Sequence, residues 1–550
     1  MSKEKRSGWW WVPSLYYAEG IPYNIAMIVS VVMFKTMGIS NTMIAFWTSI
    51  LYLPWTIKPL WSPFIDVIST KRKWITWTQL LLAVTFFAVA FTINLPSFFT
   101  ITLIILWLVA FSSATHDIAA DGFYMLALTE HQQAWFVGIR STFYRFATIT
   151  AMGLIVMLAG YIESNTGLDT VKIEVQAVSA ESIDDTFSAE DKQEVNDSEK
   201  PRIVIIPREI RLALYDEEIS KRDSTDIFFR LSAPPDSEQD IVVNFGRKSG
   251  SKDISLASPG RFVFTHENWD QPVKATIKID HRQKEPVSAI FEATAGNTPF
   301  SWAVSFTLLG FMLLAFSIYH KYILPHPTDR NTEEIKDVFS SYVEVFSTFF
   351  KKKGIIAGIL FLLFYRMAES QLVKLASPFL LDSQEVGGLA LTTAEVGFVY
   401  GTIGIVSLLL GGLLGGFLAA AHGLKKWIWW MAIGINLPDL VYVYFSYIQP
   451  DVFFLISVGV GIEQFGYGFG FTGYMLYMIY LSEGKFQTSH FAITTAFMAL
   501  GIMIPGMVSG YIQEWLGYQH FFVWVMIATI PSFVVLKFIH LDPEFGKKKK

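Results

Sequence analysis

The chain contains no cysteine, and only 17% of its 550 residues are charged. The first absence excludes disulfides, thiolate metal ligands and a cysteine nucleophile. The second argues against a soluble enzyme, in which about a quarter of the residues are charged. The sequence also lacks the basic field that binds nucleic acid, a phosphate-cradling loop, a metal-ligand cluster and a nucleophile elbow. We therefore expect no cofactor, no metal, no nucleic-acid partner and no enzymatic activity.

Long apolar runs dominate what is present, because 52% of the residues are hydrophobic. About twelve runs approach or exceed the 18–20 residues needed to cross a bilayer. We expect an all-α membrane protein with spans near residues 12–34, 43–66, 74–94, 98–127, 134–160, 300–323, 354–380, 392–420, 427–447, 452–481, 486–515 and 518–540.

One polar block interrupts this pattern. Residues 163–298 hold 26 acidic and 17 basic residues, far denser in charge than the rest of the chain. Short alternating runs with turn residues between them predict a small all-β sandwich inserted between spans 5 and 6. The predicted strands are 203–206, 227–231, 241–245, 261–264 and 273–279, and residues 169–200, which are acidic and rich in serine, are expected to form a linker. The stretches 231–235 and 264–273 resemble Calx-β-like extracellular repeats.

Basic residues predict the orientation, because Lys and Arg accumulate in cytoplasmic loops. They cluster in the N-terminal segment, at 71–73, at 351–353, at 425–426 and at 547–550, whereas the opposite short loops hold almost none apart from Lys35. Both termini are therefore expected in the cytoplasm and residues 163–298 in the periplasm. The basic N-terminus lacks a small-residue cleavage site after the first apolar run, so that run is interpreted as a retained span.

Six spans, a linker and six more spans are the pattern of the major facilitator superfamily. A weak internal repeat supports it, because residues 64–74 and 417–427 both place Phe, nine residues, a basic pair and Trp between corresponding spans. The expected units are 1–162 (spans 1–5), 163–298 (sandwich with linker), 299–324 (span 6), 325–353 (cytoplasmic linker) and 354–550 (spans 7–12). Apolar residues at helical spacing in 335–350 predict an amphipathic helix, either on the membrane face or packed under the bundle.

Ionisable side chains inside spans are the candidate functional groups, because each costs about 2.5–3.5 kcal/mol at the bilayer centre. They are Glu19, Lys58, Asp66, Asp117, Asp121, Arg140, Arg145, Arg366, Glu369, Lys374, Asp439 and Glu463. Asp117 and Asp121 share a helix face, and Arg140 and Arg145 in the next span are their expected partners, in either a structural network or a substrate site. Arg366 and Glu369, three residues apart, can pair within one helix.

Three carboxyl groups are candidates for carrying a proton. Glu463 has no cation near it in sequence, and Glu369 lies in the middle of span 7. Glu19 precedes Pro22, where we expect the helix to be interrupted. Asp66 and Arg140 are candidates for a cytoplasmic gate, and Arg145, Arg366, Lys58, Asp117, Asp121 and Tyr144 are candidates for binding substrate.

Residues 468–473 match G-x-G-x-x-G, but they lie inside an apolar span with no strand before them. Close helix packing is the favoured explanation, rather than nucleotide binding.

Several stretches resemble the AmpG-type muropeptide permeases, a branch of the major facilitators. They are residues 20–22, 58–66 with Trp74, 79–81, 110–121 with Tyr144-Arg145, and in the second half Glu463, Phe491-Ala492 and Gly510. The resemblance implies proton-coupled import of anhydromuropeptides across the bacterial inner membrane for cell-wall recycling. Arg366, Glu369 and His116 depart from the family pattern, and the sandwich has no counterpart in typical members.

The expected function is therefore a transporter that works by alternating access, with a small solute, protons and the bilayer as partners. One alternative keeps the fold and changes the cargo to an acyl-CoA, a sugar or a peptide. The other is a membrane sensor or scaffold, in which the sandwich binds a periplasmic partner or a cell-wall ligand.

Overall fold

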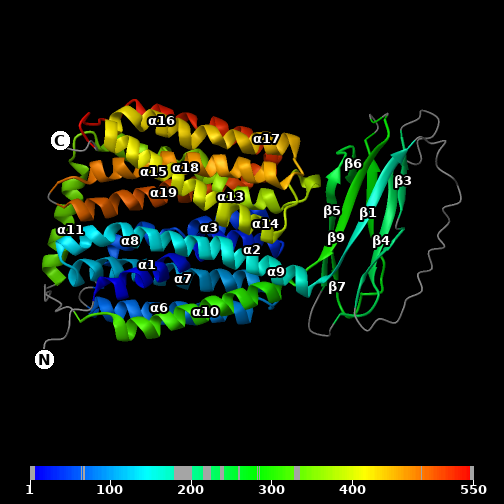
Figure 1. The fold of residues 1–550 in the computed structure, drawn as a ribbon, viewed down its shortest axis with the longest axis horizontal. Coiled ribbons are helices and arrows are strands. Elements are labelled where there is room, and N and C mark those ends of the chain that lie inside the picture. The colour runs from blue at the N-terminus through cyan, green and yellow to red at the C-terminus, as the bar shows by residue number, and fades with distance from the viewer. Residues whose placement is uncertain are drawn as a thin grey trace.

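The computed structural model describes residues 7–545 except 63–64, 66–67, 179–200, 208, 215–223, 236–240, 258–259, 281–282, 284, 327–334 and 485. A long bundle of helices carries a β-sandwich at one end (Figure 1). The first and last helices begin and end at the opposite end of the bundle (Figure 1). The sandwich is thus inserted into a helical membrane body, as the charge distribution predicts.

The N-terminal half of the bundle consists of helices before the sandwich and one helix after it. They are η1 (Gly8–Trp10), α1 (Val12–Asn24), η2 (Ile25–Val29), α2 (Ser30–Thr36), α3 (Asn41–Ile50), α4 (Leu53–Ile57), η3 (Lys58–Leu60), α6 (Lys71–Thr92), α7 (Phe98–Ala127), α8 (Glu130–Thr148), η4 (Ile149–Ile155), α9 (Val156–Thr166) and α10 (Thr298–Ile323). Pro22 does not interrupt α1. The helix instead widens into the π-helical turn η2 three residues later, because the tertiary packing around it holds the helical path.

The C-terminal half follows the helix of the linker, α11 (Ile335–Phe350). Its elements are α12 (Ile355–Phe364), α13 (Met367–Leu381), η6 (Gln384–Val386), α14 (Thr393–Phe398), η7 (Val399–Gly404), α15 (Ile405–His422), α16 (Leu424–Asn436), η8 (Leu437–Asp439), α17 (Leu440–Ile448), α18 (Phe453–Ser482), α19 (Gln487–Ile527) and α20 (Ile530–Leu536). His490 of α19 contacts Val345 and Thr348 of α11, so the described part of α11 packs under the bundle.

Nine stretches of the described chain are long and apolar enough to cross a membrane. One of them, 489–536, contains two spans, since Gly517 adopts φ 71° and breaks α19 there. This left-handed conformation suits glycine, which has no Cβ to clash. With α18 and the broken segment α3–η3, which also lie in the bundle, the total is the twelve spans that the sequence predicts (Figure 1).

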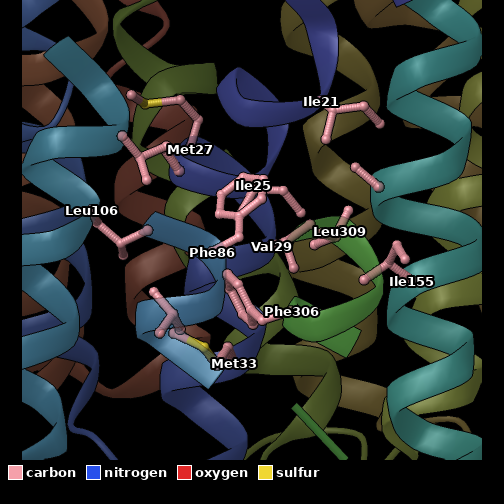
Figure 2. Packing of buried hydrophobic residues seen from close by; sticks show 14 of the residues in the cluster. Ile21, Ile25, Met27, Val29, Met33, Phe86, Leu106, Ile155, Phe306 and Leu309 are labelled. Carbon is pink, nitrogen blue, oxygen red and sulfur yellow. The ribbon is translucent and has the colours of Figure 1, made fainter. Parts of the chain in front are cut away.

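Apolar side chains fill the interior of the N-terminal half. Ile25, Phe86 and Phe306, which come from three helices far apart in sequence, meet in one buried cluster (Figure 2). Burial of such side chains contributes about 1.5–3 kcal/mol each. These contacts make the half a solid support for the few polar groups inside it.

Glycines bring three helices of the C-terminal half close together. A Cβ on Gly468 would lie 2.0 Å from the Leu408 carbonyl oxygen of α15, and one on Gly470 would lie 2.4 Å from that of Met431 in α16. The G-x-G-x-x-G stretch is therefore a packing seam, in which small residues let backbones approach.

The inserted domain is a sandwich of a five-stranded and a four-stranded sheet, ordered β3-β1-β9-β5-β7 and β2-β4-β8-β6. Only β1 and β3 pair in parallel among these described strands. The strands are β1 (Leu168–Val178), β2 (Ile203–Ile206), β3 (Ile210–Ala213), β4 (Ser224–Leu231), β5 (Ile241–Gly250), β6 (Ile254–Leu256), β7 (Arg261–Phe264), β8 (Val273–Ile279) and β9 (Val287–Ala295).

The predicted linker at 169–200 is wrong for its first ten residues, because 168–178 form β1. Ile173, Val175 and Ala177 point into the sandwich core, while Lys172 and Glu174 between them face outward. Charged and apolar residues alternate along this strand because only one of its faces is buried. The high density of charge therefore led to the incorrect prediction of a linker. Residues 179–200 lie outside the described residues.

Candidate functional site

A network of charged side chains lies inside the N-terminal half, around α7. Lys58 pairs with Asp117, and Arg140 pairs with Asp121 at 3.1 Å. Tyr16 accepts a hydrogen bond from Arg140 (3.0 Å) and donates one to Asp121 (2.9 Å). The expected pair of Arg140 with Asp121 is present, whereas Asp117 pairs with Lys58 rather than with Arg145.

Glu19 of α1 completes this network. Its buried carboxyl group faces that of Asp117 at hydrogen-bonding range. Two carboxyl groups so close together are stable when they share a proton. Glu19 and Asp117 thus form a pair that can hold a proton next to the Lys58 ammonium.

A chain of neutral polar side chains runs beside this network. Gln79 lies 2.9 Å from both His116 and His320, and His320 lies 2.9 Å from Ser14. The chain ties α6, α7, α10 and α1 together in the N-terminal half. The sequence analysis named Gln79 and His116 only through the resemblance to the permeases, and it missed His320, because no charge pattern marks it.

The main charged pair of the C-terminal half lies at the junction of α12 and α13. Arg366 contacts Glu369 at 2.9 Å and donates a hydrogen bond of 2.9 Å to the Tyr467 hydroxyl of α18. The guanidinium also lies 4.9 Å from the centre of the Phe471 ring. The other Glu369 oxygen, Oε1, is buried with no hydrogen-bond partner among the described residues.

Glu463 and Asp439 lie deeper in the same half. Gln464 donates hydrogen bonds of 3.2 and 3.0 Å to the two Glu463 oxygens. Both Asp439 oxygens are buried without a hydrogen-bond partner among the described residues. Tyr400 and Tyr442, whose hydroxyls are bonded to each other, lie near these two carboxyl groups.

Aromatic rings and cations meet where the two halves face each other. The Tyr23 ring lies 6.4, 5.2 and 6.3 Å from the rings of Tyr52, Trp55 and Tyr144. Lys374 of α13 donates a 3.1 Å hydrogen bond to Thr48 of α3 in the other half. This layer therefore contains groups that can bind a solute with both polar and apolar parts.

Two arginines lie near aromatic residues of the opposite half. The charge of Arg366 is close enough to influence Tyr23, and that of Arg145 is close enough to be influenced by Tyr467. Of the predicted substrate residues, Arg145, Arg366 and Tyr144 thus lie around the junction. Lys58, Asp117 and Asp121 neutralise one another or Arg140 within the N-terminal half.

The halves are joined at the end of the bundle that carries the sandwich. Lys35 pairs with Asp382 at 2.6 Å, and Asn41 donates hydrogen bonds of 2.8 Å to Gln513 and Tyr518. Glu163 of α9 accepts a 2.8 Å hydrogen bond from Thr393 of α14. These contacts hold the two halves together at that end, which we call the closed end of the bundle.

The sandwich itself also bridges the halves. It is joined by short connections to α9 and α10 of the N-terminal half, and β5 lies on the C-terminal half. There the Arg247 backbone N–H donates to Glu385, Lys248 donates to the Ala390 carbonyl (2.9 Å), and Lys252 donates to the Tyr447 carbonyl (2.7 Å).

The site therefore separates into parts that sequence reasoning could and could not find. The charged residues were visible one by one, but Tyr23, Tyr52 and the partner of Lys374 were not, because rings and hydroxyls in a span give no signal above ordinary packing. The predicted gate residue Asp66 lies outside the described residues.

Comparison with known proteins finds relatives that are named as AmpG transporters. No family model matches the chain. A Rickettsia felis protein that is named as the transporter AmpG 1 is 29% identical to this chain over 182 residues, which cover 33% of this chain and 40% of that protein. AmpG 2 of Rickettsia typhi is 24% identical over 217 residues (40% and 52%), and AmpG 1 of Rickettsia bellii is 27% identical over 235 (42% and 56%). The matches span about half the length of these relatives, and they confirm the resemblance to AmpG-type permeases.

Solved structures of transporters share the fold. A bacterial homologue of the human lysosomal transporter Spinster superposes with a TM-score of 0.56 at 12% identity, covering 98% of this chain and 97% of that one. The nucleoside transporter NupG gives 0.57 at 11% (96% and 99%), and a D-xylose–proton symporter gives 0.56 at 10% (96% and 97%). The helical body thus has the major facilitator fold of two six-helix bundles, as the sequence predicts.

Proposed function

We propose that this protein is a secondary transporter that moves an anionic solute across a bacterial inner membrane by alternating access, driven by protons. The observation that carries the proposal is the layer between the halves, where Lys374 of one half binds Thr48 of the other and lies 5.3 Å from the Tyr52 ring centre. A buried ammonium is costly in a membrane protein, and its position at the junction of the halves fits a group that meets a solute.

We propose anhydromuropeptides as the cargo, because the relatives carry the AmpG name and these solutes combine a sugar with an anionic peptide. Tyr23, Tyr52, Trp55 and Tyr144 supply rings on which a sugar can stack. Arg145 and Arg366 are the proposed partners for the anionic part. Lys58, Asp117 and Asp121 were further candidates, and their mutual pairing favours a supporting role.

Proton coupling is assigned to Glu463, Glu19 and Glu369, in line with the sequence prediction. Each is buried, and none is fully matched by cations among the described residues. With the basic loops in the cytoplasm, the sandwich faces the periplasm and the closed end of the bundle is the outer one. The cytoplasmic gate is assigned to Arg140, together with Asp66.

Uptake by proteoliposomes tests the proposal. Purified protein is reconstituted, an inward proton gradient is imposed, and entry of labelled N-acetylglucosaminyl-anhydromuramyl tripeptide is followed beside an acyl-CoA, a free sugar and a free tripeptide. We expect gradient-dependent uptake of the muropeptide that a protonophore abolishes. Uptake of another compound alone would assign a different cargo, and uptake of none would reject the transporter with these cargoes.

A further inference from the structure

Lys374 differs from the other buried cations of the spans. Lys58 and Arg366 each have a carboxylate partner. Lys374 is 1% exposed, and among the described residues no carboxylate pairs with it. Its contacts are the Thr48 hydroxyl and the face of the Tyr52 ring. Two of the three ammonium donors therefore remain for another acceptor.

The surroundings of Lys374 hold a second unsatisfied group. The Ser49 hydroxyl is fully buried and has no hydrogen-bond partner among the described residues. Both side chains border Gly506 of α19, where an added Cβ would lie 2.6 Å from Ser49 Oγ and 3.4 Å from Lys374 Cγ. A buried hydroxyl without a partner costs about 1–3 kcal/mol, so the Ser49 hydroxyl, which borders the same glycine as the Lys374 side chain, requires an explanation.

The groups at this place that still lack a hydrogen-bond acceptor are both donors. Thr48 already donates its hydroxyl hydrogen to the Ile44 carbonyl (2.7 Å), so it can only accept from Lys374. The ammonium and the Ser49 hydroxyl both keep a hydrogen that can be donated to an oxygen atom. An ammonium with a neighbouring hydroxyl is a receptor for an oxyanion.

We infer that Lys374 and Ser49 form a binding subsite for the oxyanion of the transported solute, a carboxylate in the cargo proposed above. The inference rests on the proposed function, and it adds the group that recognises the charge. Lys374 and Ser49 lie on opposite halves, at the junction that the sandwich end closes. Separation of the halves exposes the subsite to the outer route, and closure brings its two sides together around the bound oxygen atoms.

A chemical test needs no knowledge of the cargo, because the chain has no native cysteine. A single cysteine is placed in the subsite by Ser49→Cys, and its modification is timed with an anionic sulfonatoethyl methanethiosulfonate and with its cationic trimethylammonium counterpart. Each rate is divided by the rate of the same reagent at Glu267→Cys on the exposed sandwich surface. The ratio of anionic to cationic reactivity reports the charge that the reagent meets.

The subsite predicts that this ratio exceeds the surface value about tenfold and falls to it when Lys374→Gln is added. Loss of the bias cannot be ascribed to misfolding, because removing a buried charge without a carboxylate partner relieves a desolvation cost. An unchanged ratio in Lys374→Gln would overturn the inference. So would a Ser49→Cys that neither reagent reaches from either side of the membrane.

Transport supplies the second arm. For the muropeptide, Lys374→Gln is expected to raise KM about tenfold, whereas Lys374→Arg, which keeps the charge, changes it little. A form of the solute with amidated carboxylates is expected to lose this dependence on Lys374. If the muropeptide is not transported but the labelling bias holds, the cargo is wrong and the subsite stands. If it is transported without any effect of Lys374, the subsite is wrong and the function stands.

Discussion

At the scale of single residues, six of the twelve candidate charges inside the spans form ion pairs with one another. Asp117 binds Lys58, Asp121 binds Arg140, and Glu369 binds Arg366. Each pair reduces the cost of placing an ion in a medium of low dielectric constant. The sequence shows which residues are charged and, for Arg366 with Glu369, which are adjacent on a helix. It could not show that Asp117 pairs with Lys58, which is far away in sequence, rather than with Arg145.

The pair of Lys58 and Asp117 predicts a characteristic response to substitution. Lys58→Met leaves Asp117 without its cation and is expected to lower the free energy of unfolding by about 3 kcal/mol. The double change Lys58→Met with Asp117→Asn is expected to recover most of that loss, since no uncompensated charge remains. Thermal unfolding of the detergent-purified variants measures both effects. A double variant that is as unstable as the single one would show that the pair does not act as a unit.

Substitution of Glu463 is expected to separate proton-driven solute uptake from the exchange of solute across the membrane. Glu463→Gln keeps the size of the side chain but cannot take up a proton, so gradient-driven uptake is expected to vanish while exchange of labelled for unlabelled solute continues. The matched control is Glu483→Gln, at an exposed position just after the same helix, which is expected to keep both activities. Gradient-driven uptake that survives in Glu463→Gln would assign the proton to another group.

At the scale of helices and strands, periodicity and length carried most of the information. The span predicted at 98–127 has the observed bounds of α7, and the predicted strand 203–206 has those of β2. Four strands were missed: β1 was predicted to be part of a linker, β3 and β6 are short, and β9 lies next to the start of α10. The contact layer between the halves could not be predicted from the sequence, because it depends on the packing of segments that are hundreds of residues apart.

The glycines of α15 give a prediction with a control on the same helix. A Cβ on Gly411 would lie 2.0 Å from the Phe465 carbonyl oxygen, whereas one on Gly416 would meet nothing within 4 Å. Gly411→Ala is therefore expected to push α15 from α18 and to destabilise the protein by about 1–3 kcal/mol. Gly416→Ala is expected to be neutral or to stabilise by up to about 1 kcal/mol, because alanine favours the helix. Equal melting temperatures for the two variants would contradict the close approach.

At the scale of the whole molecule, the sandwich connects the two bodies that must move apart. Its strands lead directly into α9 and α10, while β5 binds the loop after α13 and Lys252, just after β5, binds the end of α17. Alternating access requires the halves to separate at this end. Under the proposed mechanism, the contact between β5 and the C-terminal half therefore has to break in every transport cycle.

A disulfide across this contact would hold the sandwich against the C-terminal half. A Cβ on Gly246 of β5 would lie 3.2 Å from Ser383 Cβ, a few tenths of an ångström below the usual distance in a disulfide. Gly246→Cys with Ser383→Cys introduces the only two thiols of the chain. Each single variant serves as the control under the same oxidant.

Solute uptake by proteoliposomes of this double variant, oxidised and then reduced, tests the movement of the halves most directly. The account predicts that oxidation stops uptake, that reduction restores it, and that neither treatment affects the single variants. Full uptake with the disulfide shown to be formed would contradict the separation of the halves at the sandwich end.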